Sequence, residues 1–434
     1  MPHLYLHVPF CVRRCSYCDF SIAVRKRIPA REYVEAVLGE VALLGLTDPG
    51  REPGDTEGHG LDPGREPGDT EGHGPDPGPE PGDTEGHGVD PGREPGDTEG
   101  HGLDTLYLGG GTPSLLPPDA LATLVTSLLD AFGATPSRDA VEVTAEANPE
   151  DVTPAHATAW RHAGVNRVSL GAQSFDDNVL TWMHRSHDGA RIGAAVHALR
   201  GAGIENVSLD LIFALPAELQ RNWERDLELA LSLDPDHLSL YGLTVEERTP
   251  LARWISRGAV VPPDDDRYAE EYLLAHVRLA ASGYRFYEVS NACRDERRSR
   301  HNSAYWSGRP YLGLGPAAHS YDGRARRWNV AAWPAYARAV AAGRSPVESR
   351  EVLTPQQREL ERVYLALRTD AGLPVTALHR PLPRPPGSPL GPSTARWLER
   401  GWAELRGERL VCTPQGWLRL DSLVRDLTEA GVVA

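Results

Sequence analysis

The stretch "PFCVRRCSYCDFS", from Pro9 to Ser21, holds three of the five cysteines in the chain. Cys11, Cys15 and Cys18 follow the spacing C-x3-C-x2-C, which is too tight for disulfides that join distant elements. Five cysteines in 434 residues are also too few for a disulfide framework. The pattern therefore favours a reducing compartment and a metal or redox role.

Thiolates bind soft metals, and two kinds of metal centre fit three neighbouring cysteines. A structural zinc ion needs four ligands, and the other cysteines, Cys293 and Cys412, stand far away in the sequence. A histidine such as His7 would have to complete a zinc site. A [4Fe–4S] cluster held by three thiolates instead leaves one iron open to a ligand. The spacing favours the cluster, while zinc and plain free thiols stay open as alternatives.

Outward from this stretch, short apolar runs alternate with segments of helical periodicity. Six such units in succession predict a parallel sheet covered by helices, closed into a full or partial barrel. The expected strands are residues 4–8, 105–108, 140–145, 167–171, 206–213 and 237–243, and the expected helices are residues 30–45, 118–132, 154–163, 190–199, 220–231 and 267–281.

The last part of the chain has a different pattern. Helical spacing appears at residues 356–367, 395–401 and 421–430. The segment "ERLVCTPQGWLRL", residues 408–420, is typical of a short hairpin. Together these segments predict a small α+β, winged-helix-like domain at residues 351–434.

Residues 48–103 consist of four copies of a 14-residue unit, approximately DPGREPGDTEGHGL. Each unit is rich in Gly and Pro and has at most one aliphatic residue, so it cannot bury enough apolar surface to offset chain entropy. We therefore expect a disordered insertion. Histidines 59, 73, 87 and 101 could bind a metal, although solvated side chains are the simpler interpretation.

The net charge of −16 comes mostly from this insertion, which holds 16 acidic residues and 3 arginines. The rest of the chain is nearly balanced, so the acidity says little about partners. No basic patch is interleaved with aromatic residues, which gives no support to a nucleic-acid partner. No apolar run approaches about 20 residues and no secretory signal is apparent. The sequence thus predicts a cytoplasmic protein without a membrane span.

Polar residues stand at the ends of the predicted strands. "GGGTP" follows the second strand, Glu146 ends the third, Gln173 follows the fourth, and Asp210 lies in the fifth. Because the carboxyl ends of parallel strands open on one face, these groups are expected to converge on one site. Glycines without Cβ atoms would allow close approach to a ligand, although a tight turn alone would also explain them.

These motifs resemble those of the radical S-adenosylmethionine (SAM) superfamily. The C-x3-C-x2-C loop after the first barrel strand closely resembles the loop that holds a [4Fe–4S] cluster there, which makes Cys11, Cys15 and Cys18 the expected cluster ligands. In that superfamily SAM chelates the open iron, and one electron from the cluster yields a 5′-deoxyadenosyl radical. The resemblance implies an α/β fold with a partial (β/α)6 TIM-type barrel.

Further motifs resemble the oxygen-independent coproporphyrinogen III oxidase group: "LYLGGGTPSLL", "TAEANPE", "GVNRVSLGAQSF", "LDLIFALP" and "HNSAYW". The resemblance implies that Tyr5, Gly110 and Glu146 contact the SAM at the cluster. Six other residues match positions that contact a second SAM in the oxidase: Tyr17, Gly111, Thr112, Gln173, Arg185 and Asp210.

Within this group, the chain resembles the heme chaperone, HemW-like, branch. The oxidase has a further cysteine two places after Cys18 and a longer N-terminal extension, whereas this chain has Asp19-Phe20 and begins close to the cysteines. The branch implies heme binding, transfer to acceptors such as apo-cytochromes, an unidentified electron donor, and a homodimer as one option. The alternative is the oxidase reaction itself, the radical decarboxylation of two propionates.

The motif His301-Asn302-x-x-Tyr305-Trp306 makes His301 a candidate heme ligand, because a neutral imidazole binds heme iron well. A structural histidine is the alternative, and His3, His7 and His319 compete for the same role. The repeats, the change of pattern near residue 350 and the resemblance together divide the chain into five segments. These are the start of the radical SAM core, the repeat insertion, the rest of the barrel, a family-specific extension and the C-terminal domain, at residues 1–47, 48–103, 104–245, 246–350 and 351–434.

Overall fold

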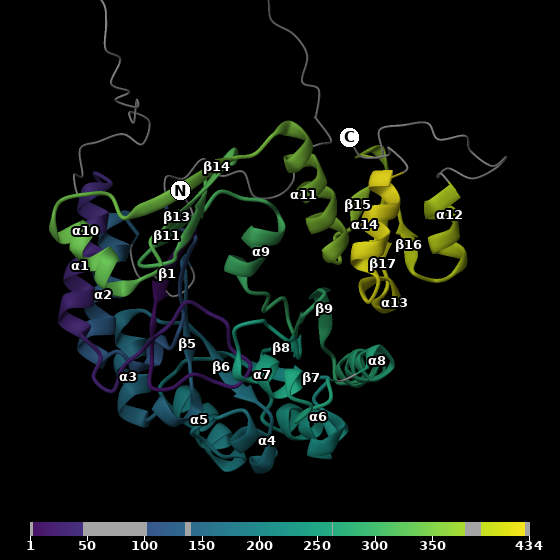
Figure 1. Cartoon of the computed structure of the whole chain (residues 1–434), viewed down its shortest axis with the longest axis horizontal. Helices are drawn as coiled ribbons and strands as arrows, with labels where there is room; N and C mark the ends of the chain where they lie inside the picture. Colours follow the sequence, from purple (N-terminus) through teal and green to yellow (C-terminus); the bar gives the residue numbers. More distant parts are fainter. Residues whose placement is uncertain (1–2, 47–101, 135–139, 263, 378–391, 430–434) are drawn as a thin grey trace, which may run out of the picture. The chain divides into compact units, whose positions relative to one another are not determined.

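The computed structural model describes residues 3–46, 102–134, 140–262, 264–377 and 392–429 (Figure 1). The repeat insertion lies outside these residues except for Gly102 and Leu103, so the disorder expected of it stays a prediction. No helix among the described residues is long and apolar enough to cross a membrane. The division of the chain into five segments also stays a prediction.

Six parallel strands lie side by side in chain order at the centre of one sheet (Figure 1). All six were predicted, and their bounds differ from the predicted ones by no more than two residues. They are β1 (His3–Val8), β4 (Thr105–Gly110), β5 (Glu142–Ala147), β6 (Arg167–Gln173), β7 (Asn206–Phe213) and β8 (His237–Gly242).

Short strands extend this sheet on both sides. β11 (Leu312–Leu314) pairs parallel with β1, while β10 (Asn291–Cys293) and β9 (Arg285–Glu288) continue antiparallel from β8. Among the described residues, the two end strands β11 and β9 do not pair with each other. The barrel is therefore partial.

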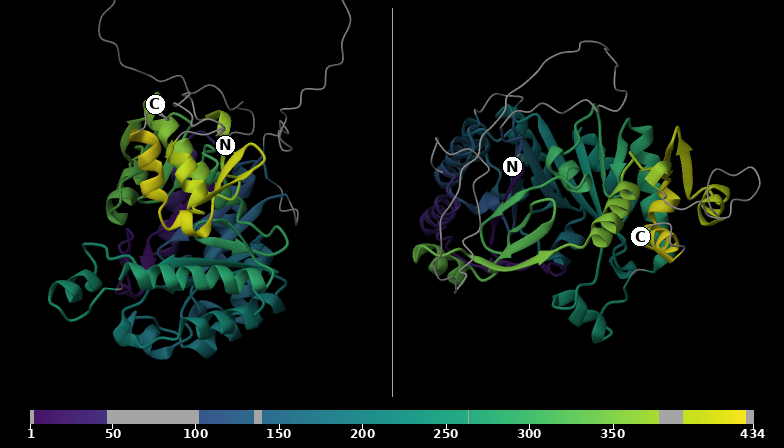
Figure 2. Two further views of the ribbon diagram at one scale, coloured as in Figure 1. Left: turned by 90° about the vertical axis from the view of Figure 1, so that its right-hand side faces the viewer. Right: turned by 90° about the horizontal axis from the view of Figure 1, so that it is seen from above.

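Helices connect the strands and cover the outer face of the sheet (Figures 1 and 2). In α2 (Pro118–Ala131), Leu121, Leu124, Val125 and Leu128 recur every three or four residues, which places them on one face, and all four are buried. The other covering helices are α1 (Ala30–Leu43), α3 (Pro154–Ala163), α4 (Asp177–Trp182), α5 (Gly189–Gly201), α6 (Trp223–Ser232) and α8 (Asp265–Ala281).

The side-chain alternation of the strands gives the sheet two different faces. In β1, Leu4 and Leu6 are fully buried in the hydrophobic core shared with the helices. His3, Tyr5 and His7 alternate with them and therefore point to the inner face of the barrel. This inner face is polar and aromatic, and it supplies the candidate site.

Two small sheets and three helices complete the barrel part. β2 (Phe10–Cys11) pairs with β3 (Ala23–Val24), and β12 (His319–Tyr321), β13 (Ala325–Asn329) and β14 (Val347–Val352) form an antiparallel sheet. Both views in Figure 2 show the short helix α7 standing away from the sheet. The three helices are α7 (Pro250–Ser256), α9 (Arg300–Trp306) and α10 (Trp333–Ala341), and 3-10 turns are η1 (Pro113–Leu115), η2 (Pro149–Asp151), η3 (Ala217–Leu219) and η4 (Val375–Ala377).

The C-terminal part combines helices with a three-stranded antiparallel sheet, which confirms the predicted small α+β domain. The hairpin predicted within residues 408–420 is wrong in its second half: β17 pairs back with β16 across a turn at Gly407, and Thr413 caps a short helix that Pro414 begins. The elements are α11 (Pro355–Arg368), β15 (Leu373–Pro374), α12 (Pro392–Glu399), β16 (Ala403–Arg406), β17 (Arg409–Cys412), α13 (Pro414–Trp417) and α14 (Leu420–Glu429).

Candidate functional site

A cavity of about 450 Å³ opens at the carboxyl ends of the parallel strands. Groups that lie as far apart in the sequence as Cys11 and Glu246 converge there, as the order of the strands predicts. The predicted residues that line it are Cys11, Cys15, Tyr17, Cys18, Gly110, Gly111, Thr112, Glu146, Gln173, Arg185 and Asp210. Tyr5 and His301 are not among the lining residues.

The loop that carries the cysteines is held at both ends and in its middle. At the ends, β2 pairs with β3, and the Ala23 amide donates to the Pro9 carbonyl at 2.6 Å. In the middle, the Ser16 amide donates to the Met183 carbonyl at 3.2 Å, and the Ser16 carbonyl accepts from the Leu251 amide at 2.9 Å. The loop is thus tied to the end of α4 and to α7, which fixes where its thiols point.

The three thiols face the same cavity in different surroundings. Cys11 is buried, its Sγ lies 3.3 Å from Thr112 Oγ1, and burial raises its pKa to about 11. Burial also raises the pKa of Cys18. Arg185 Nη1 lies 3.7 Å from Cys15 Sγ and offers it a cation. Because metal binding requires thiolates, loading this loop would release thiol protons.

No three His, Cys, Asp or Glu side chains in the described part of the chain lie close enough together to hold one metal ion. A [4Fe–4S] cluster does not require that closeness, because each thiolate binds a different iron. The assignment of Cys11, Cys15 and Cys18 as cluster ligands stays a prediction, compatible with three thiols that face one cavity.

The glycines of "GGGTP" allow the end of β4 to approach the cysteine loop closely. Gly110 has a φ of +107°, and a Cβ on it would lie 2.5 Å from the His7 ring. A Cβ on Gly111 would lie 2.7 Å from the Phe10 carbonyl oxygen. Larger residues at these two positions would push the end of β4 away from β1 and β2. The packing of these strands therefore requires both glycines, whether or not they also contact a ligand.

Two partly buried carboxylates line the cavity. Glu146 accepts hydrogen bonds from the Tyr107 hydroxyl at 2.9 Å and the Gly110 amide at 3.0 Å. Burial raises the pKa of Glu146 to about 7 despite these bonds. Asp210 accepts from the Ser169 hydroxyl at 2.9 Å, and burial also raises its pKa. The pair could accept hydrogen bonds from the ammonium or hydroxyl groups of a ligand.

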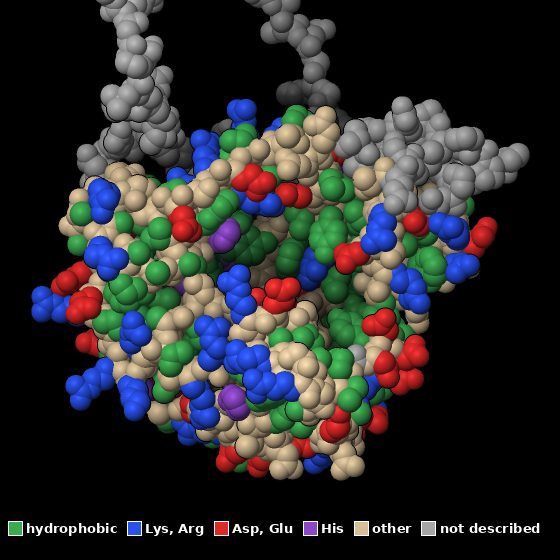
Figure 3. Space-filling model, in the orientation of Figure 1, with side chains coloured by type: hydrophobic (Ala, Val, Ile, Leu, Met, Phe, Trp, Pro, Cys, Tyr) green, Lys and Arg blue, Asp and Glu red, His purple; other side chains and the backbone are tan. Residues whose placement is uncertain are grey.

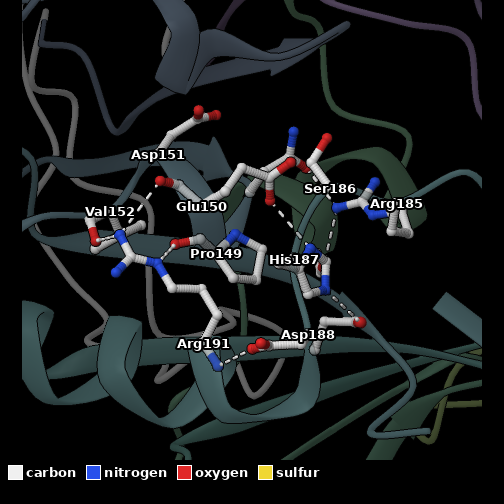
Figure 4. A network of polar contacts seen from close by, with 12 residues as sticks. Pro149, Glu150, Asp151, Val152, Arg185, Ser186, His187, Asp188 and Arg191 are labelled. Carbon is white, nitrogen blue, oxygen red and sulfur yellow. Dashed lines mark hydrogen bonds and ion pairs between the residues drawn. The ribbon is translucent and has the colours of Figure 1, made fainter. Parts of the chain in front are cut away.

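Arg185 reaches the cavity from a segment that a polar network holds in place (Figure 4). Its Nη2 donates to Asn148 Oδ1 at 2.6 Å and to the Gly171 carbonyl at 2.9 Å. Nearby, His187 bonds Glu150 at 3.0 Å, and Arg191 donates to carbonyls of residues 149 and 152. The network fixes the guanidinium, yet its buried Nε has no partner in the described residues.

Several residues that line the cavity were not singled out from the sequence. Asn148, Ser169 and Tyr241 line it, as do Glu150 and His184. Tyr241 stands near the end of the sixth strand, so the rule about strand ends would have identified it. His184 and Glu150 lie in loops, where no strand pattern indicates orientation.

Tyr5 and His301 lie deeper on the inner face. His301 is 1% exposed, its Nδ1 lies 2.7 Å from Thr105 Oγ1, and its Nε2 lies 2.9 Å from the Tyr305 hydroxyl. Burial lowers the pKa of His301 to about 3. Tyr5 stacks on His301 and on Tyr107 with ring centroids 6.4 and 6.2 Å apart. With both ring nitrogens engaged, His301 fits a structural role, and its role as a heme ligand stays a prediction.

The competing histidines occupy different positions. His3 is buried and bonds Thr105 through Nδ1, while its Nε2 has no partner in the described residues. His7 bonds Tyr5 through Nδ1 and the Ser21 carbonyl through Nε2. His319 is exposed at the start of β12 and stacks on Trp328 with ring centroids 5.7 Å apart.

Comparison with known families and structures agrees with the fold. Residues 96–230 match the radical SAM superfamily, and residues 353–419 match the HemN C-terminal domain. The structure of coproporphyrinogen III oxidase (HemN) from Escherichia coli, a radical SAM enzyme, superposes with a TM-score of 0.70 at 19% identity, covering 98% of this chain and 89% of that one. This likeness confirms the predicted radical SAM fold.

Comparison of sequences is more specific. Heme chaperone HemW from Mycobacterium tuberculosis is 36% identical over 424 residues, which cover 98% of this chain and 94% of that protein. HemW from Bacillus subtilis is 30% identical over 377 residues, covering 86% and 85%, and HemW from E. coli is 31% identical over 329 residues, covering 75% and 72%. Because these similarities extend over most of each protein, the chain belongs to the HemW family of heme chaperones within the radical SAM superfamily.

Proposed function

We propose that this protein binds heme and passes it to heme-accepting proteins, and that it carries a [4Fe–4S] cluster and SAM. Similarity to heme chaperones over 98% of the chain is the observation that carries this proposal. Acceptors of the cytochrome type, an electron donor and a cytoplasmic location are parts of the same proposal.

The cavity offers groups that fit the cluster and SAM. Cys11, Cys15 and Cys18 would bind three irons. When bound, such a cluster supplies single electrons and leaves one iron open for SAM. Glu146 in its ionised form would accept hydrogen bonds from the ammonium of SAM, and the unpartnered Nε of Arg185 would donate to an anionic or hydroxyl group of a ligand.

The region around α9 offers groups that fit heme. The buried Nε1 of Trp306 and the Nε of Arg368 have no hydrogen-bond partner among the described residues. The Arg368 guanidinium lies 4.3 Å over the Trp306 ring. A heme propionate would satisfy both donors, since an indole N–H and a guanidinium bind carboxylates well.

Flat aromatic surfaces stand next to these donors. The rings of Tyr305 and Tyr311 are 4.6 Å apart, and Tyr321 follows at 6.4 Å from Tyr311. Figure 3 shows a hollow flanked by hydrophobic side chains where α9 and α11 lie in Figure 1. A porphyrin needs such an apolar surface together with a few placed polar groups.

Titration of the full-length protein with hemin tests this proposal. Trp306→Phe removes the N–H but keeps most of the ring, and we expect it to weaken hemin binding roughly tenfold, as for one hydrogen bond to a charged group. Trp402→Phe, in the C-terminal domain, is the control and should bind hemin as the wild type does.

A parallel assay addresses the alternative. Anaerobically reconstituted protein is mixed with coproporphyrinogen III, SAM and dithionite as the one-electron reductant, and protoporphyrinogen IX is measured. Robust decarboxylation, or a protein that does not bind hemin at all, would contradict the proposed function.

A further inference from the structure

The loop between β2 and α1 exposes an unusual set of side chains beside the cysteines. The loop contains five basic residues, which we call the basic rim, and only one acidic residue, Asp19. The basic rim contrasts with the rest of the chain outside the repeat insertion, where acidic and basic residues are nearly balanced. Its members are Arg13, Arg14, Arg25, Lys26 and Arg27.

None of the rim residues forms an ion pair with Asp or Glu in the described part of the chain. Arg13 donates to the Ser186 hydroxyl, Arg14 to the Cys18 carbonyl and Arg25 to the Val24 carbonyl. Arginines elsewhere in the described chain frequently pair with carboxylates, as Arg298 and Arg326 do. The charge of the rim therefore stays available to a partner.

Apolar side chains are exposed between these charges. Phe20 is 61% exposed, Val12 is 54% exposed and Val24 is 44% exposed. An exposed apolar centre among charges is typical of a protein–protein contact surface.

We infer that the basic rim is the docking surface for an acidic protein that carries single electrons. The inference rests on the proposed function, because it gives the electron donor a place next to Cys11, Cys15 and Cys18. Opposite charges would raise the rate of encounter, and the small exposed patch suits a transient contact. The loop carries Cys15 and Cys18 and follows directly after Cys11, so a partner bound to it lies beside these thiols.

The sequence provides a direct test, because Lys26 is the only lysine in the chain. Carbodiimide coupling joins a lysine amine to a carboxylate that touches it. With a flavodoxin, a small acidic flavoprotein, as the probe, we expect coupling of the full-length protein at Lys26, and much less coupling at about 300 mM salt, where charges are strongly screened. Lys26→Arg should keep the affinity and lose the coupling.

Charge reversal tests the surface independently. We expect the double variant Lys26→Glu with Arg27→Glu to bind flavodoxin at least tenfold more weakly. The control is Arg344→Glu with Arg425→Glu, which reverses two exposed charges outside the loop, and it should bind like the wild type.

Three outcomes would overturn the inference: coupling of Lys26 to a carboxylate of its own chain, equal weakening in the control, or binding of anionic vesicles with no binding of flavodoxin. Iron content and hemin titration of the same proteins separate this result from the proposed function. If the protein assembles the cluster and binds hemin but does not bind flavodoxin, only the docking surface is refuted. If the protein neither assembles the cluster nor binds hemin, the proposed function is refuted.

Discussion

At the scale of single residues, the site depends on groups whose properties are set by burial. Glu146 is a carboxyl held between Tyr107 and the Gly110 amide, and its pKa of about 7 lies well above its ordinary value. The same residue type on an exposed helix would be ionised throughout the neutral range. Position, more than residue type, gives this carboxyl its chemistry.

The raised pKa of Glu146 predicts pH-dependent SAM binding. The carboxyl is protonated below about pH 7 and ionised above it, so the charge that attracts the SAM ammonium appears as the pH rises. We expect the affinity to rise roughly eightfold between pH 6 and 7.5, in proportion to the ionised fraction. Glu146→Gln should bind weakly with a flat profile in equilibrium dialysis. A sloping profile in that variant would assign the titration to another group.

The cysteine loop gives a second prediction. Cys15→Ala should abolish cluster assembly, because two thiolates cannot hold the cluster that three hold. Iron and acid-labile sulfide per chain are measured after anaerobic reconstitution. Cys412→Ala, a buried cysteine of β17, is the control and should keep the wild-type content. Undiminished iron and sulfide in Cys15→Ala would count against the assignment.

At the scale of elements, buried polar groups form hydrogen bonds between segments. Hydrophobic periodicity in the sequence does not indicate that these segments contact one another. Glu40 on α1 accepts hydrogen bonds from the Gly315 amide at 2.9 Å, from Asn329 Nδ2 at 2.6 Å and from the Tyr336 hydroxyl at 2.6 Å. These partners belong to the segment after β11, to β13 and to α10. One carboxyl thus holds the antiparallel sheet and α10 against the first barrel helix.

Removal of this carboxyl should destabilise the protein. Glu40→Ala leaves the Gly315 amide and the Tyr336 hydroxyl without their carboxylate partner, while Asn329 Nδ2 keeps only its bond to the Gly315 carbonyl, and we expect the free energy of unfolding to fall by about 3 kcal/mol. Urea unfolding followed by circular dichroism measures the change. Glu35→Ala on the same helix removes only an exposed pair with Arg31 and should leave the midpoint unchanged. Equal midpoints for both variants would show that the network does not stabilise the fold.

At the scale of the whole molecule, six successive βα units bring residues from distant parts of the chain to one cavity. Cys11, Glu146, Arg185 and Asp210 lie on different units, and they meet only because parallel strands end on the same side. An insertion between units is tolerated if the strands keep their order. The repeat insertion lies between the first and second of them, after α1 and before β4.

Deletion of the insertion should therefore leave the protein folded and able to bind its cofactors. Replacing residues 48–101 by a short Gly-Ser linker changes the entropy of loop closure only slightly, so we expect the melting temperature to move by no more than about 4 °C. Differential scanning calorimetry and hemin titration measure both properties. A large drop in melting temperature would mean that the repeats contribute to the fold.

The sequence by itself determined the order and type of the six βα units and, through the resemblance, the family; it did not indicate the short elements β2, β3 and β9 to β14 or the helices α4, α7, α9 and α10. Apolar periodicity and turn residues act between neighbours in the chain, so all six parallel strands could be predicted with their order. The same holds for the C-x3-C-x2-C loop, whose residues are local. The hairpin of the C-terminal domain was misplaced because the capping of a helix by Thr413 competed with strand propensity in "TPQGWLRL".

Only the tertiary structure decided which predicted residues reach the cavity and in what state. His301 and Tyr5 turned out to lie on the inner face below it, with the His301 nitrogens bonded to Thr105 and Tyr305. Gly110 is needed for its approach to His7, about a hundred residues away in the chain. Burial, ionisation and contact of this kind arise from packing between distant segments, which no local pattern in the sequence records.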